Sequence, residues 1–384
     1  MQREKDARSF LQGHLPTLDG WRGVAILLVL VAHASAAMPT PPGRVLSWIF
    51  DNILRNGSCG VDLFFTLSGF LITNRLIRDK RKIGDFALLP FYLRRAFRII
   101  PAYALFLFIL AVISILFGVN VSRGEWMTCL LHIRNLLTYA PGHGWYTAHI
   151  WSLSIEEQFY LLWPVCLAML GIRNGRTALV LAVLILPIWR NLDGQFGIVD
   201  AFIPGLNRSA RTDLRFDGLL WGCLTAILFE YPTWLARSRR VLSPSKFPLL
   251  FFGFFAIVIF RPPLMTMLLG ISAAALVACT MLNPHTLAGR MLELPWLRWV
   301  GRISYGLYLW QQIFLVSGSE LAGRPLGLAQ AFPLNVLAAF ICATISFYLL
   351  ERPMLRRGHE LALLHEQKSK PSTLPCHRDE EMLL

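Results

Sequence analysis

The sequence predicts an all-α membrane protein, a polytopic transmembrane helical bundle of about ten spans with both termini in the cytoplasm. Of its 384 residues, 55% are hydrophobic and only 16% are charged, whereas a soluble protein carries about a quarter charged residues. The apolar residues form blocks that approach the roughly 20 residues needed to cross a bilayer. Since backbone groups in lipid must find partners within the protein, these blocks are expected to be helices.

The ten apolar blocks follow one another along nearly the whole chain. Several of them are shorter than a standard span, so the predicted count carries a margin of one or two. In order, the blocks are 21–39, 58–77, 99–119, 157–170, 177–189, 217–229, 247–260, 263–282, 303–316 and 332–350.

The formal net charge of +14 has an uneven distribution that indicates a topology. With the N-terminus in the cytoplasm, nearly three quarters of the 37 Lys and Arg residues fall on the cytoplasmic side, as the positive-inside rule requires. We therefore expect lipid phosphates and an anionic cosubstrate as partners, and no nucleic acid. The seven cysteines show no C-x-x-C spacing, so neither a zinc site nor a disulfide framework is expected.

One membrane domain, residues 18–356, is expected to fill most of the chain. A cytoplasmic lead of residues 1–17 precedes it, and residues 357–384 are expected to form a cytoplasmic, largely disordered tail. The first apolar block has no small-residue cleavage site with a polar mature sequence behind it, so we expect a span and not a removed signal peptide.

His33 lies inside the first apolar block, in the stretch LLVLVAHASA. A charged group at membrane depth costs about 2.5–3.5 kcal/mol, and ionisable residues that persist there usually face the bundle interior or a wet cavity. Two interpretations stay open, a neutral histidine hydrogen-bonded between helices and a general base. A neutral ring accepts a proton, which a general base requires.

Three arginines at the predicted cytoplasmic face are candidates for binding an anion. Arg22 lies eleven residues before His33, which places both on one face of a helix, about 16 Å apart. Arg95 and Arg98 are three residues apart and share a face if helical. Arginine suits phosphate because of its planar fork, although anchoring at the membrane surface also explains these residues.

Carboxylates and aromatic residues mark the predicted outer side. Asp62 in GVDLFFTLSGFL is expected near the depth of His33, where a carboxylate can orient a catalytic imidazole. Ser68 and Gly69 in the same stretch are expected to allow tight helix packing. The segment HIWSLSIEEQFYLLWP fits a substrate mouth and fits equally an interfacial belt and helix cap. Its substrate-binding candidates are Trp151, Ser152 and Glu157. Glu156 is a catalytic candidate, because either Asp62 or Glu156 can assist His33.

A further polar entry, RTDLRFDGLLWG, contains Arg215 and Asp217. Their spacing of two residues and their opposite charges predict an ion pair, which we include among the substrate-binding candidates. Near the C-terminus, GRISYGLYLWQQ and SFYLLERP carry further polar residues.

Together these motifs resemble the acyltransferase-3 family, integral-membrane acyltransferases that include O-antigen, exopolysaccharide and Nod-factor O-acetylases. Seven motifs appear in the family's order across residues 18–356, and many members carry a histidine where this chain has Gln311. The matching stretches are LDGWRGVAI followed by His33, GVDLFFTLSGFLI, FYLRRAFRIIPAY, WSLSIEEQFYLLWP, LRFDGLLWG, GRISYGLYLW and LERP.

The resemblance implies an acyl-CoA cosubstrate, usually acetyl-CoA, with no permanently bound cofactor, and a hydroxyl acceptor on a carbohydrate such as a surface polysaccharide, lipopolysaccharide or oligosaccharide. It maps the family's arginine–histidine pair onto Arg22 and His33, and its R-x-x-R motif onto Arg95 and Arg98. We expect a multi-pass O-acyltransferase of the bacterial inner membrane. The acceptor hydroxyl either attacks the donor directly or receives an acyl group carried first by His33.

The alternative from another class is a multi-span transporter or flippase of a glycan or small anionic solute, for which intramembrane ionisable groups are also normal. The sequence lacks the paired halves with interrupted helices that indicate transporter repeats. Release of free coenzyme A from labelled acetyl-CoA distinguishes a transferase from a carrier.

Overall fold

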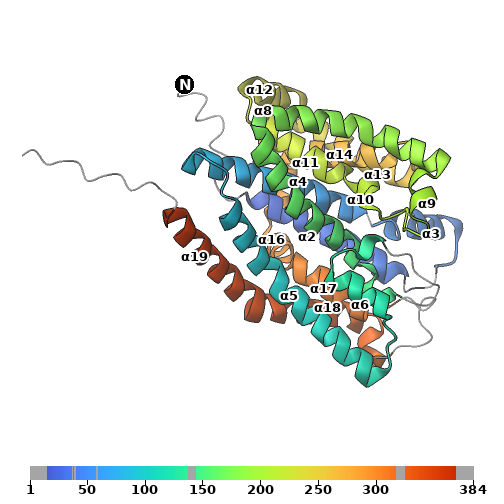
Figure 1. Cartoon of the computed structure of the whole chain (residues 1–384). Helices are drawn as coiled ribbons and strands as arrows, with labels where there is room; N and C mark the ends of the chain where they lie inside the picture. The colour runs from blue at the N-terminus through green and yellow to red at the C-terminus, as the bar shows by residue number, and fades with distance from the viewer. Residues whose placement is uncertain are drawn as a thin grey trace, which may run out of the picture.

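The structure, a computed structural model, describes residues 15–36, 38, 40–57, 59–136, 144–316 and 325–368. These residues form helices and the turns between them, and no strand occurs among them (Figure 1). The all-α prediction is therefore confirmed for the described part of the chain.

The helices vary widely in length. The first half of the chain forms α2 (Pro16–Ala36), α3 (Arg44–Ile49), the π-helical turn η2 (Phe50–Leu54), α4 (Cys59–Ile83), α5 (Leu88–Phe117), α6 (Arg123–Leu130), the 3₁₀ turn η3 (Arg134–Leu136), α7 (Trp145–Ala148) and α8 (Ile150–Phe196). The second half forms α9 (Ile198–Phe202), α10 (Thr212–Arg215), α11 (Asp217–Leu228), α12 (Pro232–Val241), η4 (Pro244–Lys246), α13 (Phe247–Phe260), α14 (Met265–Leu282), α15 (Leu287–Leu292), α16 (Pro295–Arg302), α17 (Ser304–Phe314), η5 (Gly327–Gln330), α18 (Leu334–Ser346), η6 (Phe347–Glu351) and α19 (Arg352–Lys368).

Six helical segments among the described residues are long and apolar enough to cross a membrane: α2, α3–α4, α5, α7–α8, α14 and α18–α19. The pair α11 and α12, bent by 115°, is a seventh candidate. The protein is therefore an integral, multi-pass membrane protein. Two predicted spans fall short, because α13 with 14 residues and α17 with 11 rise only about 21 and 16 Å in a core of about 30 Å. The count of ten and the cytoplasmic placement of the termini stay predictions.

The helix α8 contains a break that explains another part of the difference in span number. Gly171 has φ 69° and ψ 173°, which interrupts a segment of 47 residues. An unbroken helix of that length would measure about 70 Å, more than twice the hydrocarbon core. A positive φ strains any residue with a Cβ, so glycine suits this position. The predicted blocks 157–170 and 177–189 lie on either side of the break, and Figure 1 shows the two halves diverging.

Helices α4 and α11 form one of the closest contacts in the bundle. A Cβ atom at Gly69 would lie 2.0 Å from the carbonyl oxygen of Leu219, and one at Gly222 would lie 2.1 Å from that of Thr66. Small residues allow this approach, as is usual between membrane helices. The prediction that Gly69 allows tight packing is confirmed.

The basic segments of the chain converge at one end of the bundle. Arg22 near the start of α2 donates to Ser304 Oγ at the start of α17, at 3.2 Å. Arg94 of α5 contacts Asp79 of α4 at 2.8 Å and Glu366 of α19 at 2.6 Å. We call this the basic end, defined by Arg22, Arg75, Arg94, Arg95 and Arg98. The convergence agrees with the charge pattern of the sequence, although the side of the membrane stays a prediction.

Part of the predicted tail is helical. Residues 357–368 continue α19, which packs along α5, and a Cβ at Gly358 would lie 2.6 Å from Cβ of Phe97. Ala362 is fully buried, so this stretch has a packed face that the polar composition of the tail concealed. Residues 1–14 and 369–384 lie outside the described residues.

Candidate active site

A cavity of about 380 Å³ opens among α2, α4, α5, α8, α17 and α19. Its apolar walls come mainly from α4 and α5, while its polar groups come from all six helices. The polar lining consists of Arg22, Ser68, Arg75, Arg94, Arg95, Arg98, Ser152, Glu156, Glu157, Tyr160, Ser304, Tyr305, Tyr308 and His359. Five of these are arginines and two are glutamates, so the cavity has an excess of positive charge.

Two of the cavity arginines are held by carboxylates. Arg94 contacts Asp79 and Glu366, and Arg75 donates from Nε to Asp79 Oδ2 at 2.9 Å. Asp79 is 4% exposed, so its two arginine partners compensate a buried negative charge. Arg94 therefore links α5 to α4 and α19, whereas Arg75 pairs with Asp79 within α4.

Arg95 and Arg98 differ from that pair. In the described part of the chain, no carboxylate lies within ion-pair distance of either one. The Arg95 guanidinium lies over the Tyr160 ring, 3.5 Å from its centroid, and its Nε is buried without a described hydrogen-bond partner. Both residues line the cavity together with Arg22. Three cations thus surround one space with few anions to neutralise them.

The two glutamates lie on α8 in the same cavity. Glu156 Oε1 accepts a hydrogen bond from Ser68 Oγ at 2.7 Å, and Tyr160 donates from its hydroxyl to Ser68 Oγ at 2.9 Å. Ser68 is therefore a polar member of the site. Its hydroxyl bridges two cavity side chains, a role that the sequence did not predict, and the expectation that Ser68 allows close helix packing stays a prediction.

His33 lies half-buried near the end of α2 that is farther from the basic end. Its Nδ1 is 3.0 Å from Oε1 of Gln311 on α17, and the Trp145 ring stands edge-on to it at 6.3 Å between centroids. The ring is thus held between helices. It is not among the residues that line the cavity.

Tyr308 marks the limit of the cavity on the side of His33. It lines the cavity, its hydroxyl lies 2.5 Å from Ser152 Oγ, and the same hydroxyl donates to the carbonyl of His149 at 2.9 Å. Gln311 follows Tyr308 by three residues on α17, about 4.5 Å further along the helix. One turn of α17 therefore separates the cavity from His33.

Two sequence predictions about Asp62 and its neighbours are wrong. Asp62 does not orient His33, because its carboxylate contacts Arg215 at 3.6 Å while Gln311 occupies the ring nitrogen. Arg215 and Asp217 do not pair with each other, because Asp217 is bonded to Arg190 of α8. A spacing of two residues places the side chains on different faces of a helix, so each found a partner on another helix.

The predicted substrate-mouth residues divide between two places. Ser152 and Glu157 line the cavity. Trp151 lies outside its lining, with its ring 5.1 Å from the Arg215 guanidinium and 6.2 Å from the Phe65 ring. The structure therefore brings the α8 carboxylates to the arginines of the basic end, and it groups Trp151, Arg215 and Asp62 separately.

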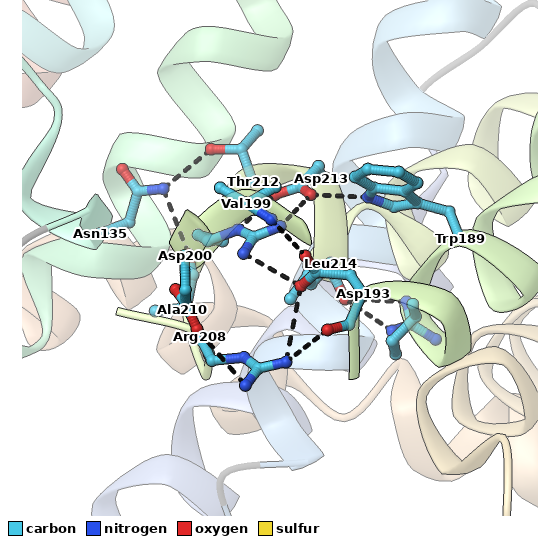
Figure 2. A network of polar contacts seen from close by, with 12 residues as sticks. Asn135, Trp189, Asp193, Val199, Asp200, Arg208, Ala210, Thr212, Asp213 and Leu214 are labelled. Carbon is cyan, nitrogen blue, oxygen red and sulfur yellow. Dashed lines mark hydrogen bonds and ion pairs between the residues drawn. The ribbon is translucent and has the colours of Figure 1, made fainter. Parts of the chain in front are cut away.

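A polar cluster that the sequence did not reveal ties the far end of α8 to α10 (Figure 2). Arg211 contacts Asp193 at 3.1 Å and Asp213 at 2.6 Å, and Trp189 donates to Asp213 at 2.8 Å. Arg211 and Asp193 are 2% and 1% exposed. We call Asp193, Arg211, Asp213 and Trp189 the α8–α10 cluster. Every charged member has an opposite charge beside it.

Several cavity and near-cavity residues were not predicted to belong to the site. Ser304, Tyr308 and Gln311 lie four and three residues apart, a spacing that puts them on one face of a helix. That spacing in SYGLYLWQQ is the signal that was available. His359 gave no such signal, because its segment was assigned to the tail.

The fold defines an integral membrane protein with a polar, mostly cationic cavity between its helices. A family comparison matches residues 15–352 to the acyltransferase domain of the acyltransferase-3 family. The chain belongs to that family, as the seven motifs indicated.

Curated relatives are named as acetyltransferases. The chain is 27% identical to "Peptidoglycan O-acetyltransferase OatA" of Listeria monocytogenes, over 92% of this chain and 58% of that protein. It is 29% identical to "Putative peptidoglycan O-acetyltransferase YrhL" of Bacillus subtilis, over 90% and 55%, and 26% identical to "O-acetyltransferase OatA" of Staphylococcus aureus, over 93% and 60%. The chain thus spans less than two thirds of the length of these relatives. No solved structure matches it.

Proposed function

We propose that the protein is a membrane-bound O-acyltransferase that moves an acetyl group from acetyl-CoA to a hydroxyl of a cell-surface glycan. Its family and the printed names of its relatives support an acetyl transfer to a glycan, with peptidoglycan as the acceptor those names favour. The bacterial inner membrane is the proposed location. The observation that carries the proposal is the cavity in which Arg95 and Arg98 have no carboxylate partner among the described residues.

The donor is proposed to bind through its phosphates at the basic end. A guanidinium offers two parallel N–H groups to a phosphate, and a charge-assisted bond of this kind is about twice as strong as a neutral one. Arg95 and Arg98 are the principal contacts, and Arg22 extends the cationic surface along α2. Arg94 contributes less because Asp79 and Glu366 already occupy its donors.

The chemistry is proposed to take place at His33. Its Nε2 removes the proton from the acceptor hydroxyl, and the hydroxyl oxygen attacks the thioester carbon. The carbon–sulfur bond then breaks, and the imidazolium returns the proton to the thiolate of coenzyme A. Glu156 lines the donor cavity and belongs to this site as a proposed catalytic partner, whereas Asp62, held by Arg215, does not.

This proposal requires a passage from the cavity to His33. Tyr308 and Ser152, whose hydroxyls are 2.5 Å apart, lie on the side of the cavity toward Gln311. The Tyr308 hydroxyl also donates to the His149 carbonyl, so moving it breaks at least two hydrogen bonds, each with a net worth of about 1 kcal/mol, which binding of the donor must offset. The pantetheine arm of the donor is proposed to displace this contact and bring the thioester to the ring.

The test uses the purified protein in lipid nanodiscs with labelled acetyl-CoA and a soluble glycan acceptor. The proposal expects labelled glycan together with free coenzyme A. His33→Ala is expected to lower the rate by about 10²–10⁴-fold, the contribution typical of a general base. The exposed histidine His285 provides the matched control, and His285→Ala should keep the wild-type rate. Absence of free coenzyme A from the wild-type protein would reject the transferase and favour a carrier.

A further inference from the structure

The helices α2 and α17 run side by side in the same direction and are joined by two side-chain contacts. At the basic end, Arg22 donates to Ser304 Oγ at 3.2 Å, and at the other end His33 contacts Gln311 at 3.0 Å. Ser304, Tyr308 and Gln311 share one face of α17. One face of α17 therefore contacts Arg22 at the basic end, lines the cavity through Tyr308, and contacts His33, the proposed base, through Gln311.

Gln311 is fully buried and has an incomplete set of hydrogen bonds. Its side chain is 0% exposed, and its Nε2 has no hydrogen-bond partner among the described groups. The contact with His33 is therefore the only polar contact of this amide in the described part of the chain. A buried donor left without a partner costs about 1–3 kcal/mol, so an apolar residue of similar size would fill this position at lower cost. Stability alone does not explain a glutamine here.

The contact bears directly on which ring nitrogen of His33 can accept a proton. A neutral imidazole carries one proton, and its other nitrogen holds the free electron pair. If Gln311 Oε1 accepts a hydrogen bond, Nδ1 must carry the proton and Nε2 must hold the electron pair. Among the described residues, Nε2 has no hydrogen-bond partner. Hydrogen bonding at one nitrogen fixes the role of the other.

We propose that Gln311 is the positioning residue of His33. Its Oε1 accepts the Nδ1–H hydrogen bond, holds the ring in one tautomer and leaves Nε2 for the acceptor hydroxyl. The same bond persists when Nε2 takes the proton, so Gln311 also stabilises the imidazolium. This inference rests on the proposed function, in which His33 is the base. Gln311 thus takes the role of orienting the His33 ring, which the sequence predicted for Asp62.

Two variants separate positioning from simple packing. Gln311→Met keeps the length of the side chain and removes the acceptor, and we expect kcat to fall about 10–100-fold with the KM for acetyl-CoA unchanged. Gln311→Glu keeps the acceptor and adds a negative charge beside the ring. Because a carboxylate favours the imidazolium, the acid limb of the kcat/KM profile should move to higher pH by about one unit.

Other groups that titrate near this end of the bundle must be kept constant. The elements around α2 carry several titratable side chains. Among them, His149 interacts electrostatically with His33. Asp62 is held by Arg215, and Asp51 by Arg55. The groups to be left unchanged are Asp51, Cys59, Asp62, His149 and Tyr308, together with Arg298 and Arg302 of α16 at the basic end.

Gln330 provides a matched control. It is 1% exposed and donates to the Ile313 carbonyl at 2.8 Å and to the Tyr146 hydroxyl at 3.2 Å, without contacting His33. Gln330→Met and Gln330→Glu therefore disturb a buried amide of the same kind. They should leave the acid limb where it is in the wild-type protein, whatever they do to the yield of folded protein.

The outcomes distinguish this inference from the function on which it rests. If His33→Ala keeps the wild-type rate, the proposed mechanism fails as a whole. If His33→Ala is inactive but Gln311→Met keeps the wild-type kcat, the positioning role alone is rejected. An acid limb for Gln311→Glu that coincides with that of the wild-type protein also rejects it. A shift for Gln311→Glu with none for Gln330→Glu supports it.

Discussion

Arginines that face the interior occur in two different settings in this protein. In the α8–α10 cluster, Arg211 lies between Asp193 and Asp213, at 3.1 and 2.6 Å. In the cavity, Arg95 lies over the Tyr160 ring with its Nε unpaired among the described groups, and Arg98 has no described carboxylate within ion-pair distance. The first arrangement is complete within the chain, whereas the second leaves positive charge for a ligand to neutralise.

The presence or absence of a carboxylate partner explains why Arg211 and the cavity arginines are expected to differ in role. A buried ion pair contributes little net stability, but removal of one partner is costly because the other charge stays buried. Removal of an arginine that has no carboxylate partner leaves no buried negative charge uncompensated. Substitution in the α8–α10 cluster should therefore affect stability, and substitution in the cavity should affect donor binding.

The largest effect is expected for Arg211→Ala. It leaves Asp193, 1% exposed, without its main partner, and we expect a loss of about 3 kcal/mol of stability. Thermal unfolding in detergent measures this loss, and the KM for acetyl-CoA of the remaining folded protein should not change. Arg208→Ala is the matched control, because Arg208 is 43% exposed and 3.8 Å from the same carboxylate. An equal loss in both variants would contradict the comparison.

The next largest effect is expected for Arg95→Met and Arg98→Met, on donor binding. Loss of a hydrogen bond to a charged group costs about 1.5–3 kcal/mol, so each should raise the KM for acetyl-CoA about 10–100-fold with little change in melting temperature. Steady-state kinetics and a melting curve measure both quantities.

Arg94→Met is the control from the same helix. Arg94 also lines the cavity, but Asp79 and Glu366 hold its guanidinium. It should lower the melting temperature more and raise the KM less than the substitutions at Arg95 and Arg98. If all three variants behaved alike, the presence of a carboxylate partner would not decide the role of an arginine.

A smaller effect is expected for Tyr160→Leu, which removes the ring under Arg95. A cation–π contact is worth about 0.5–2 kcal/mol, which corresponds to roughly a 2–30-fold rise in KM if the ring holds the guanidinium ready for a phosphate. Tyr160→Phe retains the ring and loses only the hydrogen bond to Ser68. It should bind the donor nearly as the wild-type protein does. A Phe variant as weak as the Leu variant would assign the effect to the hydroxyl.

The sequence predicted those parts of the protein that depend on one helix at a time. The apolar blocks predicted an all-α protein. The spacing of three residues predicted that Arg95 and Arg98 share a helix face, and both line the cavity. Partners on different helices were not predictable in this way. Tertiary packing, and not spacing along the chain, decides which of these groups meet. The pairs observed are Asp62 with Arg215, Asp217 with Arg190, and His33 with Gln311.

The predicted count of ten spans is not confirmed, for a related reason. A hydrophobic block reports length and composition, and it does not report how the chain bends between one block and the next. Gly171 breaks α8, and a 115° bend separates α11 from α12. The α8–α10 cluster was not predicted because its charged residues come from two elements that are separated in the sequence, Asp193 in α8 and Arg211 and Asp213 at the start of α10.

The smallest effect is expected for Asp213→Asn in the α8–α10 cluster and depends on pH. Burial opposes ionisation of Asp213, but the hydrogen bonds from Arg211 and Trp189 outweigh it and lower the pKa of this carboxyl below its ordinary value of 3.8. A lowered pKa stabilises the folded protein above the ordinary value, and this contribution disappears as the pH falls through the folded-state pKa. Asp213→Asn should therefore melt below the wild-type protein at pH 7, and the difference should shrink below about pH 4. Melting curves at pH 7, 5 and 3 measure it. A difference that stays constant across this range would show that the amide, and not the loss of charge, causes the effect.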